Sequence, residues 1–305
     1  MSYIKSSILL FIALICLNTD AVATERFKPF KPPGRFINLG MHVMYIECIG
    51  HQSPTVLIDV GLADSSANWY QVAKNLAQEV RTCVYDRAGY GWSDPGPGDR
   101  TTAQIVHELN MLLEVAEIPG PYVIVGHSFG GFTARYFATV YPVKTVGVVL
   151  IDSSHPDQIY RLSELDNAKK KQPMKISRRE PAPDYMSEFE KRWYFLNSSR
   201  KATFAQMDEL KSFKKSANQV KYAGPFPDVP LAIVTRGKEL LPIVNGIYLE
   251  QEWQEMQLEL LNLSKHSWHS IIKESGHNMY RDAPDDVIDN ILTVVEQARD
   301  NINKH

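Results

Sequence analysis

The chain has 305 residues, of which 44% are hydrophobic, and this is enough apolar surface for one large core or two smaller ones. Its net charge of −2 argues against a dedicated nucleic-acid-binding protein, because such proteins gather positive charge on their surface. No internal repeat or low-complexity tract is visible.

The first 23 residues predict a secretory signal peptide. Lys5 precedes an apolar stretch from Ile8 to Leu17, and Ala21-Val22-Ala23 has the small-x-small pattern of a cleavage site. The apolar stretch is short for a membrane span, although an uncleaved anchor is the alternative. We therefore expect cleavage after Ala23, a mature chain over 24–305 without a stable membrane span, and an exported protein, either periplasmic or secreted.

Two cysteines remain in the mature chain, Cys48 and Cys83. An even number of cysteines permits a disulfide in an oxidising compartment. A pair of buried free thiols is the alternative, and the residues alone leave both open.

Apolar runs and turn signals predict strands alternating with helices through the first half of the chain. The first two strands meet at a tight turn at Gly40, and Thr101 or Thr102 caps the last helix. In order, the predicted elements are the strand pair over 35–50, the strand over 54–61, the helix over 67–80, the strand and glycine-rich loop over 81–94, and the helix over 101–118.

A serine between glycines follows the next strand, in "YVIVGHSFGGFTARYFA" at 122–138. The apolar residues before the serine are typical of a buried parallel strand, and those after it have helical spacing over 129–141. A tight strand-to-helix turn has no room for bulk, which explains Gly126 and Gly130. The turn presents the hydroxyl of Ser128 beside a helix N-terminus, whose free N–H groups bind anions. A capping serine in an ordinary glycine-rich turn is the alternative.

The second half continues the alternation after one long interruption. The stretch over about 157–226 is basic, with 15 Lys and Arg against 9 Asp and Glu. Such clusters are typical of solvated faces, and attraction of anionic substrates or a membrane surface is the alternative. Strands alternating with helices indicate a parallel sheet, with ligands at the carboxyl ends of its strands. The remaining predicted elements are strands over 146–152, 230–237 and 267–278 and helices over 248–263 and 284–300.

Four segments make the chain resemble the α/β-hydrolase superfamily across residues 35–300. They are "VLIDVGL" at 56–62, "YDRAGYGWSD" at 85–94, "VGHSFGG" at 125–131 and "SGHNMYRDAP" at 275–284. The resemblance implies the α/β-hydrolase fold, a mostly parallel eight-stranded sheet flanked by helices, with an antiparallel second strand. It also implies a helical cap inserted over about 157–226.

The resemblance implies that Ser128 is the nucleophile, on an elbow formed with Gly126, His127 and Gly130, and that His277 is the base. The chemistry agrees, because a serine hydroxyl is too weakly acidic to attack unaided and a neutral imidazole must accept its proton. His277 follows an apolar strand late in the chain, in the family's order of serine, acid and histidine.

The same resemblance assigns an oxyanion hole and favours the disulfide. Many members have His-Gly after the third strand, where this chain has Val60-Gly61-Leu62. The donor is a backbone N–H, so we expect Leu62 and Phe129 to form the oxyanion hole. In the family's strand order the second and fourth strands are antiparallel neighbours, which places Cys48 beside Cys83.

The acid of the catalytic triad is predicted to be Asp152. The family more often places this carboxylate after the seventh strand, but "PLAIVTRGKELLPIV" at 230–244 contains no aspartate, and its only carboxylate is Glu239. Asp152 ends the sixth strand, where some members carry the acid, and a strand end gives it a fixed position. Glu239 is the alternative acid, and Asp157 is a third choice.

The sequence predicts an exported serine hydrolase that cleaves carboxylic esters through an acyl-enzyme intermediate. A serine at position 128 excludes the family's dehalogenase and epoxide-hydrolase mechanism, which needs an aspartate there. The alternatives are a non-catalytic ligand-binding relative and other acyl-transfer chemistry, as in an amidase, a carbon–carbon hydrolase or an acyltransferase. We expect a small-molecule ester or acyl substrate, and neither a cofactor, a metal site nor a nucleic-acid partner.

Overall fold

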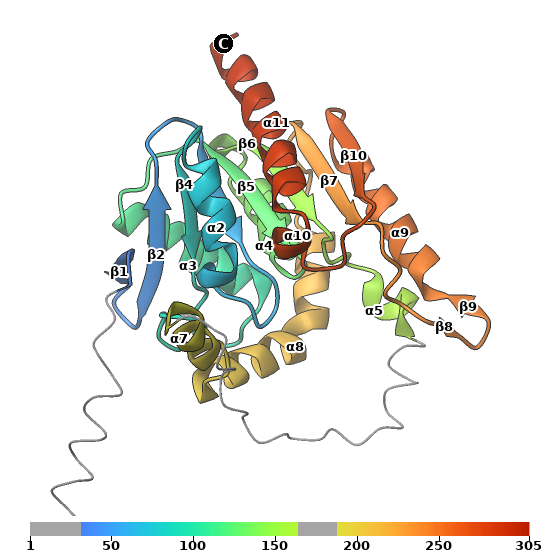
Figure 1. The fold of residues 1–305 in the computed structure, drawn as a ribbon, viewed down its shortest axis with the longest axis horizontal. Coiled ribbons are helices and arrows are strands. Elements are labelled where there is room, and N and C mark those ends of the chain that lie inside the picture. The colour runs from blue at the N-terminus through green and yellow to red at the C-terminus, as the bar shows by residue number, and fades with distance from the viewer. Residues whose placement is uncertain (1–31, 164–187, 305) are drawn as a thin grey trace, which may run out of the picture. The chain divides into compact units, whose positions relative to one another are not determined.

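An eight-stranded sheet forms the centre of the structure, a computed structural model that describes residues 32–163 and 188–304 (Figure 1). The predicted signal peptide over 1–23 lies outside the described residues, as does the part of the predicted cap over 164–187. The described residues from Gly34 onward belong to one compact unit.

The order of strands across the sheet is β1-β2-β4-β3-β5-β6-β7-β10. β2 is antiparallel to both of its neighbours, and the strands from β4 to β10 are parallel, as predicted. β8 (Ile243–Val244) and β9 (Ile247–Tyr248) form a separate hairpin. The strands of the large sheet are β1 (Arg35–Asn38), β2 (Val43–Ile49), β3 (Thr55–Asp59), β4 (Thr82–Tyr85), β5 (Tyr122–His127), β6 (Thr145–Ile151), β7 (Leu231–Arg236) and β10 (Ser267–Ile272).

The helices lie close to their predicted positions. The side chain of Thr101 accepts a hydrogen bond from the backbone N–H of Gln104 and so caps α3, as expected. The predicted helix over 248–263 is α9 followed by a 3₁₀ turn, η2. The helices are α2 (Ser66–Leu76), α3 (Thr102–Val115), α4 (Gly130–Val140), η1 (Pro142–Lys144), α5 (Gln158–Arg161), α7 (Glu188–Asn197), α8 (Arg200–Lys221), α9 (Leu249–Glu259), η2 (Leu260–Leu263), α10 (Met279–Asp282) and α11 (Pro284–Asn303).

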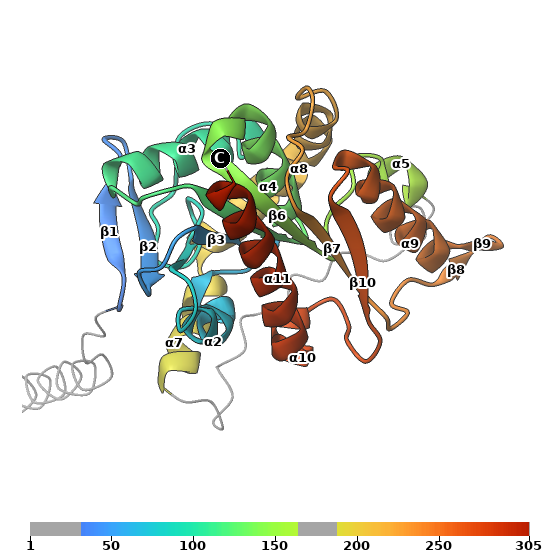
Figure 2. The same cartoon turned by 90° about the horizontal axis from the view of Figure 1, so that it is seen from above.

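Helices cover both faces of the sheet and make two hydrophobic cores. Figure 2 shows α3 and α4 on one face and α2 and α11 on the other. The first core joins apolar residues of α3 and α4 to one side of the strands, and the second joins those of α2 and α11 to the other. β3, β5 and β6 are buried on both sides and are mostly apolar, as is typical of strands in a parallel sheet.

Cys48 on β2 and Cys83 on β4 form a disulfide, as the strand order predicted. The two residues are directly paired in the antiparallel register of these strands. The bridge therefore links the N-terminal strand pair to the parallel part of the sheet.

The carboxyl ends of the parallel strands meet at one edge, and α8 passes across that edge (Figure 1). The residues predicted to carry the chemistry follow β3, β5, β6 and β10 at this same edge. Of the stretch over 157–226, the described residues include α5, α7 and α8.

Candidate active site

Ser128 occupies the turn between β5 and α4 and has a backbone φ of +52°. A positive φ strains a residue that has a Cβ, so the turn must be held by its surroundings. The Ser128 N–H donates to the Ile151 carbonyl at 3.0 Å, and the Ser128 carbonyl accepts from the Gly131 and Ser154 N–H groups. A Cβ on Gly126 would lie 2.5 Å from the Gly130 carbonyl oxygen, which explains why this elbow needs glycine.

His277 lies between Ser128 and Asp152 and contacts both. Its Nε2 is 3.0 Å from the Ser128 Oγ, and its Nδ1 is 2.6 Å from the Asp152 Oδ2. An ionised carboxylate only accepts hydrogen bonds, so the proton of a neutral His277 lies on Nδ1. Nε2 then has a free lone pair that faces the serine hydroxyl, an arrangement that can remove its proton.

Asp152 is fully buried and receives three hydrogen bonds from side chains. Besides His277, the Trp253 Nε1–H donates to Oδ1 at 2.8 Å, and the Arg236 Nη1–H donates to Oδ2 at 2.6 Å. Burial opposes a negative charge here, but the bond from His277 and the charge of Arg236 outweigh it and lower the pKa of Asp152. The carboxylate is therefore ionised and fixed in position.

Arg236 ends β7, the strand after which the family more often carries its acid. Its Nη2–H donates to the Glu250 Oε2 at 3.1 Å, and the same oxygen accepts from the Leu240 and Leu241 N–H groups. The loop after β7 is thus tied to α9. Glu239, the alternative acid, is exposed on this loop, and its hydrogen bond with Tyr248 raises the pKa of that hydroxyl.

The predicted oxyanion donors, Leu62 and Phe129, lie on the two loops beside Ser128. A Cβ on Gly61 would be 3.4 Å from the Ser128 Cβ, so the backbone before Leu62 runs against the serine. Within residues 32–163 and 188–304, neither the Leu62 N–H nor the Phe129 N–H has a hydrogen-bond acceptor. Neither N–H group therefore has a competing acceptor in this part of the chain, as the predicted oxyanion role requires.

His127 supports the backbone of His277 from inside the fold. Its Nε2 is 2.8 Å from the His277 carbonyl oxygen, and the two rings are 4.8 Å apart. Burial, with a smaller contribution from His277, lowers the pKa of His127 to about 3. His127 is therefore neutral at pH 7, and its Nε2–H donates to the carbonyl.

The side chains that hold these groups in place were not predicted from the sequence. Arg236 and Trp253 contact Asp152, and the fully buried Arg87 contacts the loop after β3. Arg87 lies within the quoted "YDRAGYGWSD", so the motif pointed to the segment but not to its partner. Trp253 lies in the predicted helical segment over 248–263, and no local signal distinguishes it.

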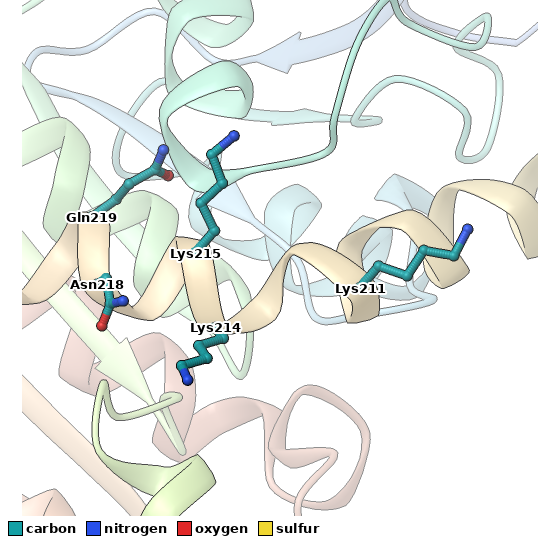
Figure 3. A pocket seen from close by; sticks show the side chains of 5 residues that line it. All are labelled: Lys211, Lys214, Lys215, Asn218 and Gln219. Carbon is teal, nitrogen blue, oxygen red and sulfur yellow. The ribbon is translucent and has the colours of Figure 1, made fainter.

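Three basic residues of α8 line a shallow cavity that does not include the candidate catalytic residues. This cavity of about 650 Å³ is lined by α8 residues alone, and Figure 3 shows their side chains pointing in different directions along the helix. Ion pairs join Lys211 to Asp208 and Lys215 to Asp99. Neither Ser128 nor His277 lines this cavity, so it does not mark the candidate active site. Its lining residues are Lys211, Lys214, Lys215, Asn218 and Gln219.

The described residues hold neither a candidate metal site nor a membrane-spanning helix. They contain no group of three or more His, Cys, Asp or Glu side chains placed to hold a metal ion. No helix in this part of the chain has the length and apolar character needed to cross a membrane.

Known proteins share this arrangement of elements. A family model described as the alpha/beta hydrolase fold matches residues 54–183. The uncharacterized protein YqjL of Bacillus subtilis (strain 168) is 26% identical over 235 residues, which cover 77% of this chain and 81% of that protein. Three further relatives are longer, and this chain spans 18%, 29% and 26% of their lengths.

Solved structures with a similar fold carry out different chemistry. A His-tagged serine hydrolase involved in carbazole degradation (the CarC enzyme) is 19% identical, with a TM-score of 0.63 over 86% of this chain and 98% of that chain. An epoxide hydrolase mutant from Vigna radiata is 14% identical, with a TM-score of 0.65 over 86% of this chain and 98% of that chain. At these identities the likeness concerns the fold alone.

Proposed function

Because this chain has the fold of the α/β-hydrolase superfamily, we propose that it is an exported serine hydrolase that cleaves carboxylic esters through an acyl-enzyme intermediate. The observation that carries the proposal is the pair of hydrogen bonds linking Ser128 to His277 and His277 to Asp152. A serine at position 128 favours this chemistry over epoxide hydrolysis, which in this superfamily uses an aspartate nucleophile.

The proposed reaction begins when the Ser128 Oγ attacks the ester carbonyl carbon. His277 Nε2 accepts the hydroxyl proton, and Asp152 stabilises the resulting imidazolium through Nδ1. The carbonyl oxygen becomes an oxyanion and is bound by the N–H groups of Leu62 and Phe129. His277 then gives its proton to the departing alkoxide, which leaves as an alcohol. The acyl group remains bound to the Ser128 Oγ as the acyl-enzyme.

A water molecule completes the cycle. His277 removes a proton from the water, which attacks the acyl carbon, and the second tetrahedral intermediate uses the same two N–H donors. When that intermediate collapses, the proton returns to the Ser128 Oγ and the carboxylic acid leaves.

Two further parts of the proposal concern the cap and the compartment. α7 and α8 belong to the inserted stretch over 157–226, and α8 crosses the carboxyl edge of the sheet, which supports a cap over the catalytic face (Figure 1). The Cys48–Cys83 disulfide supports an oxidising compartment, in agreement with a signal peptide over 1–23.

A panel of p-nitrophenyl esters of graded acyl-chain length tests the proposed reaction. The mature protein should hydrolyse at least one chain length, and Ser128→Ala should abolish turnover. Ser270→Ala is the matched control, because the Ser270 Oγ on β10 accepts a hydrogen bond from Asn290 of α11 and is not part of the hydrogen-bonded group of Ser128, His277 and Asp152. Full activity in Ser128→Ala would reject the proposed nucleophile, and no turnover of any ester by the wild type would reject ester hydrolysis.

A further inference from the structure

Arg87 is a fully buried residue just after β4, and all five of its N–H hydrogens are used. Nη1 donates to the Asp59 Oδ1 and to the Val60 carbonyl, both at 2.6 Å. Nη2 donates to the Gly61 carbonyl at 2.9 Å and to the Glu209 Oε2 at 3.2 Å, and Nε donates to the Glu209 Oε1 at 2.8 Å. Although burial alone would lower it, the charges of Glu209 and Asp59 raise the pKa of Arg87 well above its ordinary value.

The bond to Gly61 bears directly on Leu62, because both groups belong to one peptide unit. A trans peptide is planar, so the Gly61 carbonyl and the Leu62 N–H point in opposite directions. Because the buried Arg87 binds the Gly61 carbonyl, the Leu62 N–H points away from Arg87. The bond to the Val60 carbonyl fixes the preceding peptide in the same way.

Glu209 brings a second element into the same cluster. It lies on α8 and is fully buried, although it comes 122 residues after Arg87 in the chain. The Tyr90 hydroxyl also donates to the Glu209 Oε2 at 2.9 Å. The two oxygens of Glu209 therefore bind one edge of the guanidinium, while Asp59 at the end of β3 and the loop after it bind the rest.

We propose that Arg87 is the positioning residue of the oxyanion hole, and that Glu209 makes the seating of α8 a condition for the geometry of that hole. The inference rests on the proposed function, since it assigns the Leu62 N–H to the reaction. α8 then affects catalysis without contacting the reacting atoms. If α8 moves, Glu209 no longer binds one edge of the Arg87 guanidinium, and Arg87 no longer fixes the peptide group that carries the Leu62 N–H.

The test compares Arg87→Lys, Glu209→Gln and the double variant that combines both. Lysine keeps the charge but has three donors and no planar fork, so it cannot bind the loop and Glu209 together. Loss of one oxyanion donor costs about 10²- to 10³-fold in kcat, and we expect Arg87→Lys to approach that loss with KM changed less than about threefold. Glu209→Gln should lower kcat less. The double variant should be no slower than Arg87→Lys alone, because both act through one peptide group.

A fluorophosphonate, left to react to completion, counts the competent sites in each preparation, so kcat refers to folded enzyme. Affinity for a trifluoromethyl ketone, whose adduct carries an oxyanion, should fall in parallel with kcat. Arg100→Lys is the matched control, because Arg100 is also buried and paired with a carboxylate, Glu108, at 2.7 Å. The Arg100→Lys variant should have the same kcat as the wild type. If Arg87→Lys does not fold, Glu209→Gln carries the same test.

Unchanged kcat in the Arg87 and Glu209 variants would overturn the inference, as would losses that multiply in the double variant or an equal loss in Arg100→Lys. Failure of the proposed function looks different. In that case the wild type itself gives no adduct at Ser128 and no ester turnover.

Discussion

At the scale of single residues, Asp152 and Arg236 form a buried ion pair at the carboxyl ends of two neighbouring strands. Asp152 directly follows β6 and has a positive φ of +40°, and Arg236 ends the neighbouring β7. The Arg236 guanidinium therefore lies at the end of the strand after which the superfamily more often carries its acid. Its Nη1–H donates to the Asp152 carboxylate. The result is a buried, ionised carboxylate aimed at His277.

The assignment of the acid predicts a large difference between two conservative substitutions. Asp152→Asn should lower kcat by about 10³- to 10⁴-fold, because an amide no longer fixes the proton of His277 on Nδ1. Glu239→Gln should stay within about twofold of the wild type, as expected for an exposed carboxylate outside the hydrogen-bonded group. Steady-state kinetics on both variants, after circular dichroism shows that they fold, decides between the two acids. A large loss in Glu239→Gln with an active Asp152→Asn would reverse the assignment.

His127 predicts a pH dependence of stability. Its pKa is about 3 in the folded protein against an ordinary value of 6.5, so below pH 6.5 the unfolded chain binds a proton that the folded chain does not. The free energy of unfolding should therefore decrease as the pH falls from 6.5 towards 3, at a limiting slope of about 1.4 kcal/mol per pH unit.

Urea unfolding at a series of pH values from about 7 to about 4 measures this slope. His127→Gln is the informative variant, because the glutamine Nε2 can still donate to the His277 carbonyl while the side chain does not titrate. The variant should lose less stability on acidification than the wild type. Parallel curves for both proteins would show that His127 is not the group responsible.

At the scale of elements, the disulfide between β2 and β4 should act on stability and leave the chemistry intact. It closes a loop with a sequence separation of 35, and bridges of this kind contribute about 2–4 kcal/mol. Cys48→Ser combined with Cys83→Ser should lower the free energy of unfolding by that amount while kcat per labelled site stays unchanged. Urea unfolding of the oxidised protein and of the double variant provides the comparison. Equal stabilities would show that the bridge contributes nothing to the folded state.

The sequence predicted the presence of helices and strands better than the residues at which they end. The predicted helix over 67–80 stops at Leu76, because the next residues close a turn with bonds from the Gln78 and Glu79 N–H groups three residues back. No glycine or proline marks that end, so the periodicity alone could not locate it. By contrast, Pro284 opens α11 where the sequence placed its start.

At the scale of the whole molecule, motifs located the proposed catalytic residues but not the residues that support them. Ser128 and His277 each lie in a short segment with a local pattern, and Asp152 was inferred from the end of a strand. The contacts Arg87–Glu209 and Trp253–Asp152 join segments more than a hundred residues apart. Such pairs depend on how layers pack, and one sequence has no local signal for them.

Export belongs to the whole chain and remains a prediction, since residues 1–31 lie outside the described part. When the full chain is expressed in a bacterium with a secretory pathway, the mature protein should begin at Thr24, directly after the predicted cleavage site. N-terminal sequencing of the periplasmic or secreted fraction checks this. A chain that stays at full length in the membrane fraction would indicate an uncleaved anchor instead.

Covalent labelling of Ser128 tests the central claim most directly. The mature protein is treated with a fluorophosphonate, digested and mapped by mass spectrometry, beside Ser128→Ala and Ser270→Ala. Under the proposed mechanism His277 accepts the proton of Ser128, so the wild type and Ser270→Ala should carry one adduct, at Ser128. Ser128→Ala should carry none. An adduct at another residue, or an unlabelled wild type that still hydrolyses esters, would contradict the claim that Ser128 is the nucleophile.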